Sequence, residues 1–293
     1  MITTEVKAID LPLAEDPVEK WRPYPLFSGP TPAHDQMACH VSVLSPGHCP
    51  HPPHEHVEEE LLIILNGEAD ILIANGPQPE GAHVERLRAG SFVYYPAHQH
   101  HTIRNCPAAP VSYLMFKWCA APANIERPLA TTFYHFDGET SPPASEGFAP
   151  RLLFEHPTAY LTKLHAHLTD LKPGAGYPPH ADKYDVAIVV LSGRVETLGQ
   201  TVERGGVIYY SAGELHGMKN VGDTLARYLV FEFHSPRLQE IDQPERVAAH
   251  IDQPETARRT SFFFETFQRL MSRVMRRSAP QVHQLAQRPR QSP

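Results

Sequence analysis

Short apolar segments alternate with turn-forming residues along most of the chain. The segments are rich in Val, Ile, Tyr and Phe and are separated by Gly, Pro and Asn, a pattern typical of β-strands joined by turns. Residues 61–65 and 69–74 flank Asn66-Gly67, a pair that supplies the positive φ angles of a tight hairpin. Residues 41–44 and 91–95 predict further strands. The pattern therefore predicts an all-β fold, built as a sandwich or as closed barrels.

The same unit occurs twice in the chain. Residues that recur at one fixed offset are Gly90 and Gly205, Tyr94 and Tyr209, His101 and His216, and Phe116 and Phe231. Upstream, Pro52-Pro53-His54 recurs as Pro178-Pro179-His180. A repeat of this length is a domain rather than a solenoid module, so the sequence predicts two similar domains in tandem.

Changes in composition set the predicted domain bounds. The predicted parts are an N-terminal segment (1–34), domain 1 (35–119), a linker (120–149), domain 2 (150–235) and a C-terminal extension (236–293). Within the extension, apolar residues at helical spacing predict an amphipathic α-helix over 261–277, followed by a flexible tail. Its Phe-rich face is expected to pack on the body or on a second subunit, with a membrane surface as the alternative.

Charge and cysteine content exclude several classes of function. The net charge of −7 gives no basic field for nucleic acid, whose binding depends on phosphate neutralisation. The longest apolar run, residues 186–191, is far shorter than the ~20 residues of a membrane-spanning helix. Residues 1–20 lack the basic start and apolar run of a secretory signal, so we expect a cytoplasmic protein. The 4 cysteines show no paired short spacing and are expected to be reduced thiols.

Histidine carries the candidate chemistry, with 19 copies in the chain. His54, His56 and Glu60 are at even spacing, so an extended strand would place them on one face, and His101 on another strand could join them. Three imidazoles and one carboxylate suit Fe, Mn, Ni, Co or Zn, because the set contains no thiolate. Four protein ligands leave one or two coordination positions open, as catalysis at a metal requires.

These residues resemble the two motifs of the cupin family, G-x5-H-x-H-x3,4-E-x6-G and G-x5-P-x-G-x2-H-x3-N. The residues that match the first motif, with one extra residue after the first glycine, are Gly47, His54, His56, Glu60 and Gly67. Those that match the second are Gly90, Pro96, His101 and Asn105, with His98 where a glycine belongs. The resemblance covers about residues 35–235 and implies two tandem cupin-type antiparallel β-barrels (double-stranded β-helix), with a metal in domain 1.

Domain 2 departs from the cupin pattern at the ligand positions. Asp182 replaces the second histidine and Val186 replaces the glutamate, although His180 and His216 are kept. Because Val186 cannot bind a metal, domain 2 is predicted to be a scaffold. The alternative is that His180, Asp182 and His216 hold a second metal weakly, as two histidines and one carboxylate do in some iron oxygenases.

Other polar residues flank the predicted ligands. His98 is the candidate catalytic residue, acting as a proton shuttle, with an exposed loop histidine as the alternative. His40 and His167 occupy equivalent places and are interpreted as structural in both barrels or as pocket-lining in the first. Glu58 and Glu59 are expected to be solvated, although Glu58 is an alternative ligand in a distorted strand.

The motifs leave three functions open. The leading hypothesis is a mononuclear non-haem iron dioxygenase acting on a small organic acid, diketone or aromatic substrate, with Mn, Ni, Zn or Co as alternative metals. The second is a non-redox Mn or Zn enzyme, namely an aminohydrolase, decarboxylase, lyase or isomerase. The third is a small-molecule-binding or sensor protein without catalysis. A homodimer is also expected, because exposed sheet faces and edges commonly pair.

Overall fold

The computed structural model describes residues 1–105, 109–136, 147–239 and 283–284. Strands in the first half of the chain are β1 (Glu5–Lys7), β2 (Trp21–Gly29), β3 (Gln36–Leu44), β4 (Glu59–Asn66), β5 (Glu68–Ile73), β6 (His83–Arg88), β7 (Phe92–Tyr95), β8 (His101–Asn105), β9 (Val111–Cys119) and β10 (Thr132–Tyr134). Those that follow are β11 (Phe148–His156), β12 (Lys163–Leu171), β13 (Gly176–His180), β14 (Asp185–Ser192), β15 (Arg194–Thr197), β16 (Gln200–Glu203), β17 (Val207–Tyr210), β18 (His216–Asn220), β19 (Ala226–His234) and β20 (His283–Gln284).

The all-β prediction is confirmed. Among the described residues, the single α-helix is the short α1 (Pro236–Gln239). The helix predicted over 261–277 lies outside the described residues. None of the helices in the described part of the chain has the length and apolar composition that crossing a membrane requires.

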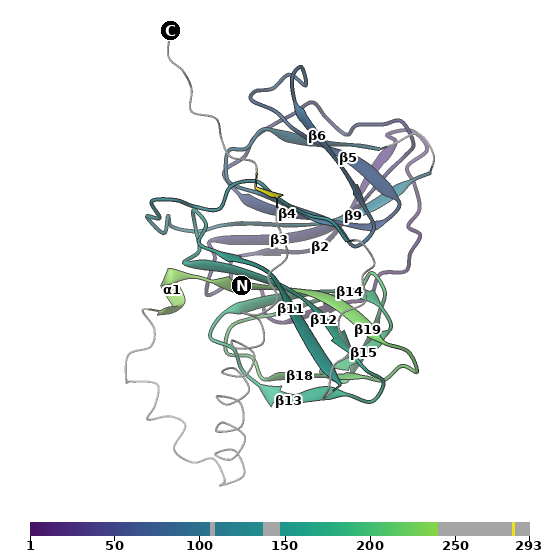
Figure 1. Ribbon diagram of the computed structural model, residues 1–293, viewed down its shortest axis with the longest axis vertical. Coiled ribbons are helices and arrows are strands. Elements are labelled where there is room, and N and C mark those ends of the chain that lie inside the picture. The colour runs from purple at the N-terminus through teal and green to yellow at the C-terminus, as the bar shows by residue number, and fades with distance from the viewer. Residues whose placement is uncertain (106–108, 137–146, 240–282, 285–293) are drawn as a thin grey trace.

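The first barrel consists of two antiparallel sheets that face each other (Figure 1). The larger sheet has the strand order β2-β3-β9-β4-β7-β10-β20, and the smaller has the order β6-β5-β8. Inward side chains such as Leu62, Ile71, Val93 and Tyr113 form one apolar core between the sheets. Asn66-Gly67 forms the turn between β4 and β5, and Gly67 has a φ of 79°. The predicted hairpin is wrong, because β4 pairs with β7 and β9 in the larger sheet whereas β5 pairs with β6 and β8 in the smaller one.

The second barrel repeats this plan. Its larger sheet has the order β1-β17-β14-β19-β12-β11, and its smaller sheet has the order β13-β18-β15-β16. Val186, Ile188, Val202 and Tyr210 belong to its core. The N-terminal strand β1 pairs with β17 of this barrel, whereas β2 pairs with β3 of the first barrel. The N-terminal segment thus contributes a strand to each barrel, and the sequence pattern predicted neither strand.

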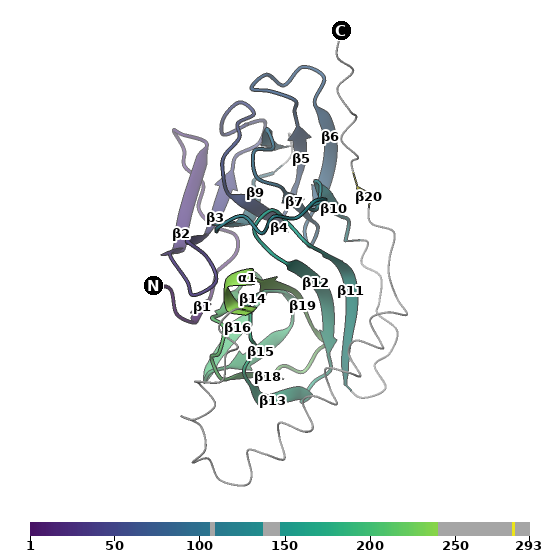
Figure 2. The ribbon, with the colours of Figure 1, turned by 90° about the vertical axis from the view of Figure 1, so that its left-hand side faces the viewer.

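The outer faces of the two large sheets pack against each other (Figure 2). Phe92 meets Phe231 with ring centroids 5.1 Å apart, and Trp118 meets Phe233 at the same separation. Each large sheet therefore buries one face inside its barrel and the other between the barrels. This explains why β4 and β14 are almost continuously buried instead of alternating between buried and exposed positions.

A buried carboxylate fixes the connection between the barrels. Glu59 accepts hydrogen bonds from Trp118 Nε1 (2.9 Å), Thr158 Oγ1 (2.7 Å) and the Ala159 backbone N–H (2.7 Å). Glu59 is 0% exposed, so the expectation that it is solvated is wrong. Burial raises the pKa of Glu59, because the hydrogen bonds offset only part of the loss of solvation. Glu59 thus ties β4 to the segment that leads into β12.

Asp185 holds the equivalent place in the second barrel. Its carboxylate accepts hydrogen bonds from Tyr209 (2.6 Å), Thr31 Oγ1 (3.0 Å) and the Ala212 backbone N–H (2.8 Å), and it contacts the His34 ring at 3.2 Å. Thr31 and His34 belong to the N-terminal segment. Glu59 of the first barrel thus binds the segment that leads into the second barrel, and Asp185 of the second barrel binds the N-terminal segment that leads into the first.

Candidate metal centre

The predicted ligands come from three places in the first barrel. Glu60 is the second residue of β4 and His101 is the first residue of β8. His54 and His56 precede β4 instead of lying on the same strand as Glu60. Two prolines stand before His54, and proline interrupts a ladder because it has no N–H to donate. His54 and His101 pair as an isolated antiparallel bridge, which brings the segment before β4 next to the start of β8.

The three imidazoles converge. One ring nitrogen from each of His54, His56 and His101 lies within 4.8 Å of the other two. The Nδ1–H of His56 donates to the Glu58 carbonyl at 2.9 Å, and the Nδ1–H of His101 donates to the Gln99 carbonyl at 2.7 Å. A carbonyl only accepts, so both rings hold their proton on Nδ1 and carry the lone pair on Nε2. Both lone pairs are thereby available to a metal.

Glu60 completes the group. Its Oε2 lies 3.2 Å from His56 Nε2 and 3.6 Å from His101 Nε2, and its side chain is 0% exposed. Two imidazole lone pairs and a carboxylate are all acceptors, so they cannot satisfy one another. His54 Nδ1, His101 Nε2 and Glu60 Oε1 are buried with no hydrogen-bond partner among the described residues. The donor set therefore fits a divalent transition metal.

Lys117 is the charged neighbour that sequence reasoning missed. Its Nζ lies 3.0 Å from Glu60 Oε2 and 3.2 Å from His56 Nε2. It comes from β9, where it stands directly across from Glu60 in the β4–β9 ladder. A lysine in the mostly apolar strand β9 was a visible signal, but only the register of the sheet places it against the carboxylate.

The charges of the site favour ionised Glu60 and neutral His54. Burial opposes ionisation of Glu60, but His101, His56 and Lys117 together outweigh it and hold the pKa of Glu60 well below its ordinary value. Burial, followed by the charges of His51 and His101, lowers the pKa of His54 to about 4. His54 is therefore neutral near pH 7, the state in which imidazole binds metals.

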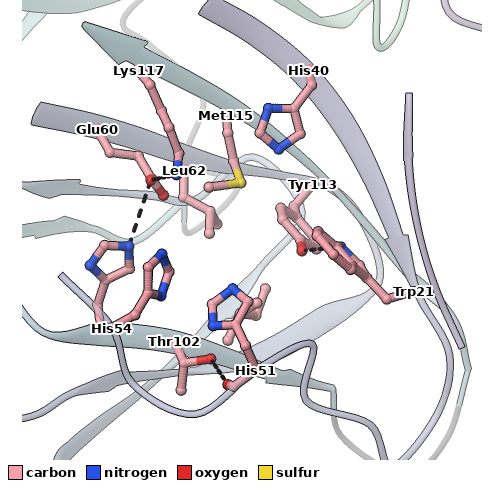
Figure 3. Close-up of a pocket in the computed structure, with 12 residues that line it drawn as sticks. Trp21, His40, His51, His54, Glu60, Leu62, Thr102, Tyr113, Met115 and Lys117 are labelled. Atoms are coloured by element: carbon pink, nitrogen blue, oxygen red, sulfur yellow. Dashed lines mark hydrogen bonds and ion pairs between the residues drawn. The ribbon is translucent and has the colours of Figure 1, made fainter. Parts of the chain in front are cut away.

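A cavity of about 240 Å³ opens beside this group (Figure 3). Its lining includes the ligand candidates His54, Glu60 and His101 together with Trp21, His40, His51, Leu62, Thr102, Ile103, Tyr113, Met115 and Lys117. Trp21 is a residue of β2, and its indole N–H donates to the Tyr113 hydroxyl at 3.0 Å. The cavity is smaller than the ~300–1,000 Å³ of a drug-sized site, so it fits a small molecule.

The two halves of the chain match a known domain family. A family model described as "Cupin domain" matches residues 40–117 and again residues 167–232. Each match covers the central strands of one barrel, in the order that the duplicated sequence predicts. The chain belongs to the cupin family. It carries two cupin domains, so the bicupin prediction is confirmed.

Solved structures with the same fold are distant in sequence. A putative glyoxylate-induced protein from Pseudomonas aeruginosa has a TM-score of 0.59 and 15% identity, covering 80% of this chain and 90% of its own. Oxalate decarboxylase from Lactobacillus farciminis, in a formate complex, has a TM-score of 0.52 and 14% identity, and the match covers 76% of this chain and 86% of the decarboxylase. AerE from Microcystis aeruginosa has a TM-score of 0.52 and 16% identity, and the match covers 73% of this chain and 99% of AerE. No curated protein sequence matches the chain.

His98 takes the place of a cupin-motif glycine. Its φ of 62° lies in the left-handed region, and Gly213 at the equivalent place in the second cupin domain has a φ of 85°. The His98 backbone N–H donates to the His56 carbonyl at 2.8 Å, which holds this loop against the ligand segment. The ring is not part of the cavity lining described above, so its role as a proton shuttle stays a prediction.

The second cupin domain also gathers its motif residues. His180 Nε2 and His216 Nε2 lie 3.5 Å and 3.4 Å from Asp182 Oδ2. Burial raises the pKa of Asp182, but hydrogen bonds with the two histidines outweigh it and hold that pKa well below its ordinary value. Val186 belongs to the apolar core of this barrel. Metal binding by this triad, like the scaffold role predicted for the domain, stays untested.

Proposed function

We propose that the first cupin domain holds one divalent transition metal and that the chain is a metal-dependent enzyme. His54, His56, Glu60 and His101 would be the ligands. The observation that supports this proposal is the convergence of imidazole lone pairs and a buried carboxylate, none of which can satisfy another, beside a cavity of about 240 Å³. The substrate would be a small molecule that enters this cavity.

Within this proposal, the leading function is a mononuclear non-haem iron dioxygenase for a small organic acid, diketone or aromatic compound. Iron, when bound, would act as a Lewis acid and as the source of electrons for dioxygen. Trp21, Leu62 and Met115 line the cavity and would exclude water from the reacting atoms. The ammonium group of Lys117 adds positive charge beside the ligands, which favours an acidic substrate.

Elemental analysis and oxygen uptake test this function. Protein prepared with ample metals should contain one first-row transition metal per chain in the first domain, and His101→Ala should lose most of it. Iron-loaded protein should consume dioxygen in an electrode with a member of the substrate classes above. Turnover that continues without dioxygen would remove the dioxygenase assignment while leaving the metal site intact.

A non-redox Mn or Zn enzyme is the second candidate, and Lys117 is the observation that favours it. An ammonium group within hydrogen-bond distance of a ligand carboxylate can act as an acid or base for proton transfer, which lyases, isomerases and decarboxylases need. Full activity after replacement of iron by redox-inert zinc would select this class. Calorimetric binding of a ligand that emerges chemically unchanged would instead indicate a sensor.

A further inference from the structure

A second group of candidate metal ligands lies inside the second barrel and consists of residues outside the cupin motifs. His165 and His167 on β12 and Glu232 on β19 each offer a donor atom, and these atoms lie within 4.8 Å of one another. His165 stands directly across from Glu232 in the β12–β19 ladder. His167 is two residues further along the same face, so all three side chains share one side of the sheet.

Each imidazole of this group has one ring nitrogen without a hydrogen-bond partner among the described residues. His165 Nε2 and His167 Nδ1 are buried without a hydrogen-bond partner among the described residues, and each residue is only 6% exposed. A buried polar atom left unpaired destabilises a protein, and native structures contain few of them. Two such nitrogens grouped with one carboxylate indicate a cation that would engage all three.

Neighbouring side chains hold His165 and Glu232 in place by hydrogen bonds, as is usual for metal ligands. His165 Nδ1 lies 2.8 Å from Glu155 Oε2, which leaves Nε2 as the free ring nitrogen. A carboxylate behind a histidine fixes the ring and increases its basicity as a ligand. Glu232 is held in turn by His234, whose Nε2 lies 2.9 Å from Glu232 Oε2.

Comparison of the two barrels shows that this group belongs to the second one alone. The first barrel carries Ala38 where the second has His165, because both residues stand across from equivalent positions in their ladders. It carries Lys117 where the second has Glu232. The carboxylate absent at Val186 thus reappears directly across the ladder at Glu232, accompanied by an additional histidine.

We propose that His165, His167 and Glu232 form a second divalent-metal site, distinct from the His180, Asp182 and His216 triad. Two imidazoles and one carboxylate without a thiolate suit Zn²⁺ and the other first-row divalent ions. Three protein ligands leave a position for water or a small exogenous ligand. The site is independent of the metal proposed for the first domain, because its residues all come from strands of the second barrel.

Zinc stoichiometry of the full chain tests this site. Metal-free protein is loaded with Zn²⁺, freed of excess by gel filtration and analysed for zinc per chain. His165→Ala installs the residue that the first barrel carries, and Glu232→Gln keeps the shape of the side chain. Each should lose about one zinc per chain relative to the unmodified protein. Circular dichroism checks that the variants are folded. If His165→Ala does not fold, Glu232→Gln alone provides the test.

Two matched controls locate the loss. His83→Ala removes a surface histidine that is paired with a carboxylate, Glu85, and should bind as much zinc as the unmodified protein. His180→Ala should retain the zinc that His165→Ala loses. The proposal is overturned if His165→Ala and Glu232→Gln bind full zinc, or if the loss occurs in His180→Ala alone. A metal lost only in His101→Ala would concern the first domain instead, so the two proposals fail separately.

Discussion

Lys117 supplies an ammonium group to the buried carboxylate of Glu60, with its Nζ 3.0 Å from Glu60 Oε2. Replacing it by methionine keeps the length of the side chain but leaves a buried carboxylate without its ammonium partner. Lys117→Met should lower the free energy of unfolding of the metal-free protein by about 2 kcal/mol, less than the ~3–5 kcal/mol of a fully buried pair because Lys117 is partly exposed. Metal should remove most of this difference, since the ion supplies positive charge at Glu60.

Denaturant unfolding with and without metal measures this effect. Lys7→Met is the control, because Lys7 forms a surface ion pair with Glu5 at 2.8 Å and such pairs contribute about 0–1 kcal/mol. A Lys117→Met variant as stable as the unmodified protein, in the absence of metal, would contradict the charge-balancing role.

His98 combines a backbone cost with a proposed chemical role, and two substitutions separate them. A residue other than glycine in the left-handed region costs about 1 kcal/mol or more, so His98→Gly should be at least as stable as the unmodified protein and His98→Ala should be less stable than His98→Gly. If the ring shuttles protons, both variants lose turnover, including the stable glycine variant. Thermal unfolding and steady-state rates provide the two measurements, and full turnover by His98→Gly would remove the catalytic assignment.

At the scale of elements, Glu59 links β4 to the segment before β12. Glu59→Ala would leave the Trp118 indole N–H, the Thr158 hydroxyl and the Ala159 N–H buried without an acceptor. Each unsatisfied group costs about 1–3 kcal/mol, so the variant should lose about 3 kcal/mol or more of unfolding free energy. Glu58→Ala is the matched control, because the Glu58 side chain is partly exposed and contacts the His56 ring at 3.4 Å, and the His56 N–H keeps the Glu58 carbonyl as its acceptor in the variant. Its change should stay within ~0.5 kcal/mol. Equal losses in the two variants would refute the proposed link.

The elements that the sequence predicted are those with strong local signals. Asn66-Gly67 forms its turn, and the duplicated strands recur in both barrels, because turn chemistry and apolar runs act over a few residues. The pairing of β4 and β5 as a hairpin was wrong, because the turn carries the chain from one sheet to the other. Strand β2 was missed because Pro23 and Pro25 read as breakers, although an edge strand tolerates proline. Glu59 was expected in solvent because a run of three glutamates gives no local sign that one of them crosses to the other barrel.

The candidate site was predictable to the extent that motif spacing fixes it. His54, His56 and His101 come together, and Glu60 contacts His56 and His101, as the spacing predicts, although the two prolines place His54 and His56 before the strand. Lys117 and the group around Glu232 were not predicted, because their positions depend on the register of β9 and β19 against neighbouring strands. Register is set by the packing of a whole sheet, and a one-residue shift would turn these side chains to the opposite face.

At the scale of the whole molecule, the two barrels share a core. The apolar outer faces of the two large sheets cover each other within one chain, so these faces supply no surface for a second copy. The homodimer expected from exposed sheets stays a prediction. The shared core also means that a change in the first barrel alters the stability of the whole described body, so a metal ion bound there should be visible in global unfolding.

The pH dependence of unfolding follows from the ligand residues. The pKa of His54 is lowered to about 4 in the folded, metal-free protein from an ordinary 6.5, so below pH 6.5 the unfolded chain takes up a proton that the folded chain refuses. The stability contributed by neutral His54 is thus complete above pH 6.5 and is lost as the pH falls toward 4. A bound metal steepens this loss, because protonation of the imidazoles also releases the ion.

Thermal unfolding with and without chelator measures the contribution of the metal. At pH 7.5, metal-loaded protein should melt at a higher temperature than chelated protein, and the difference should shrink as the pH falls toward 4, the pKa of His54, because the imidazole then binds a proton instead of the ion. His54→Gln should reduce the difference at pH 7.5, while His83→Ala should leave it unchanged because His83 is an exposed histidine that is paired with Glu85 and is not among the proposed ligands. Identical melting of loaded and chelated protein at pH 7.5 would mean that the convergent imidazoles of the first cupin domain hold no metal.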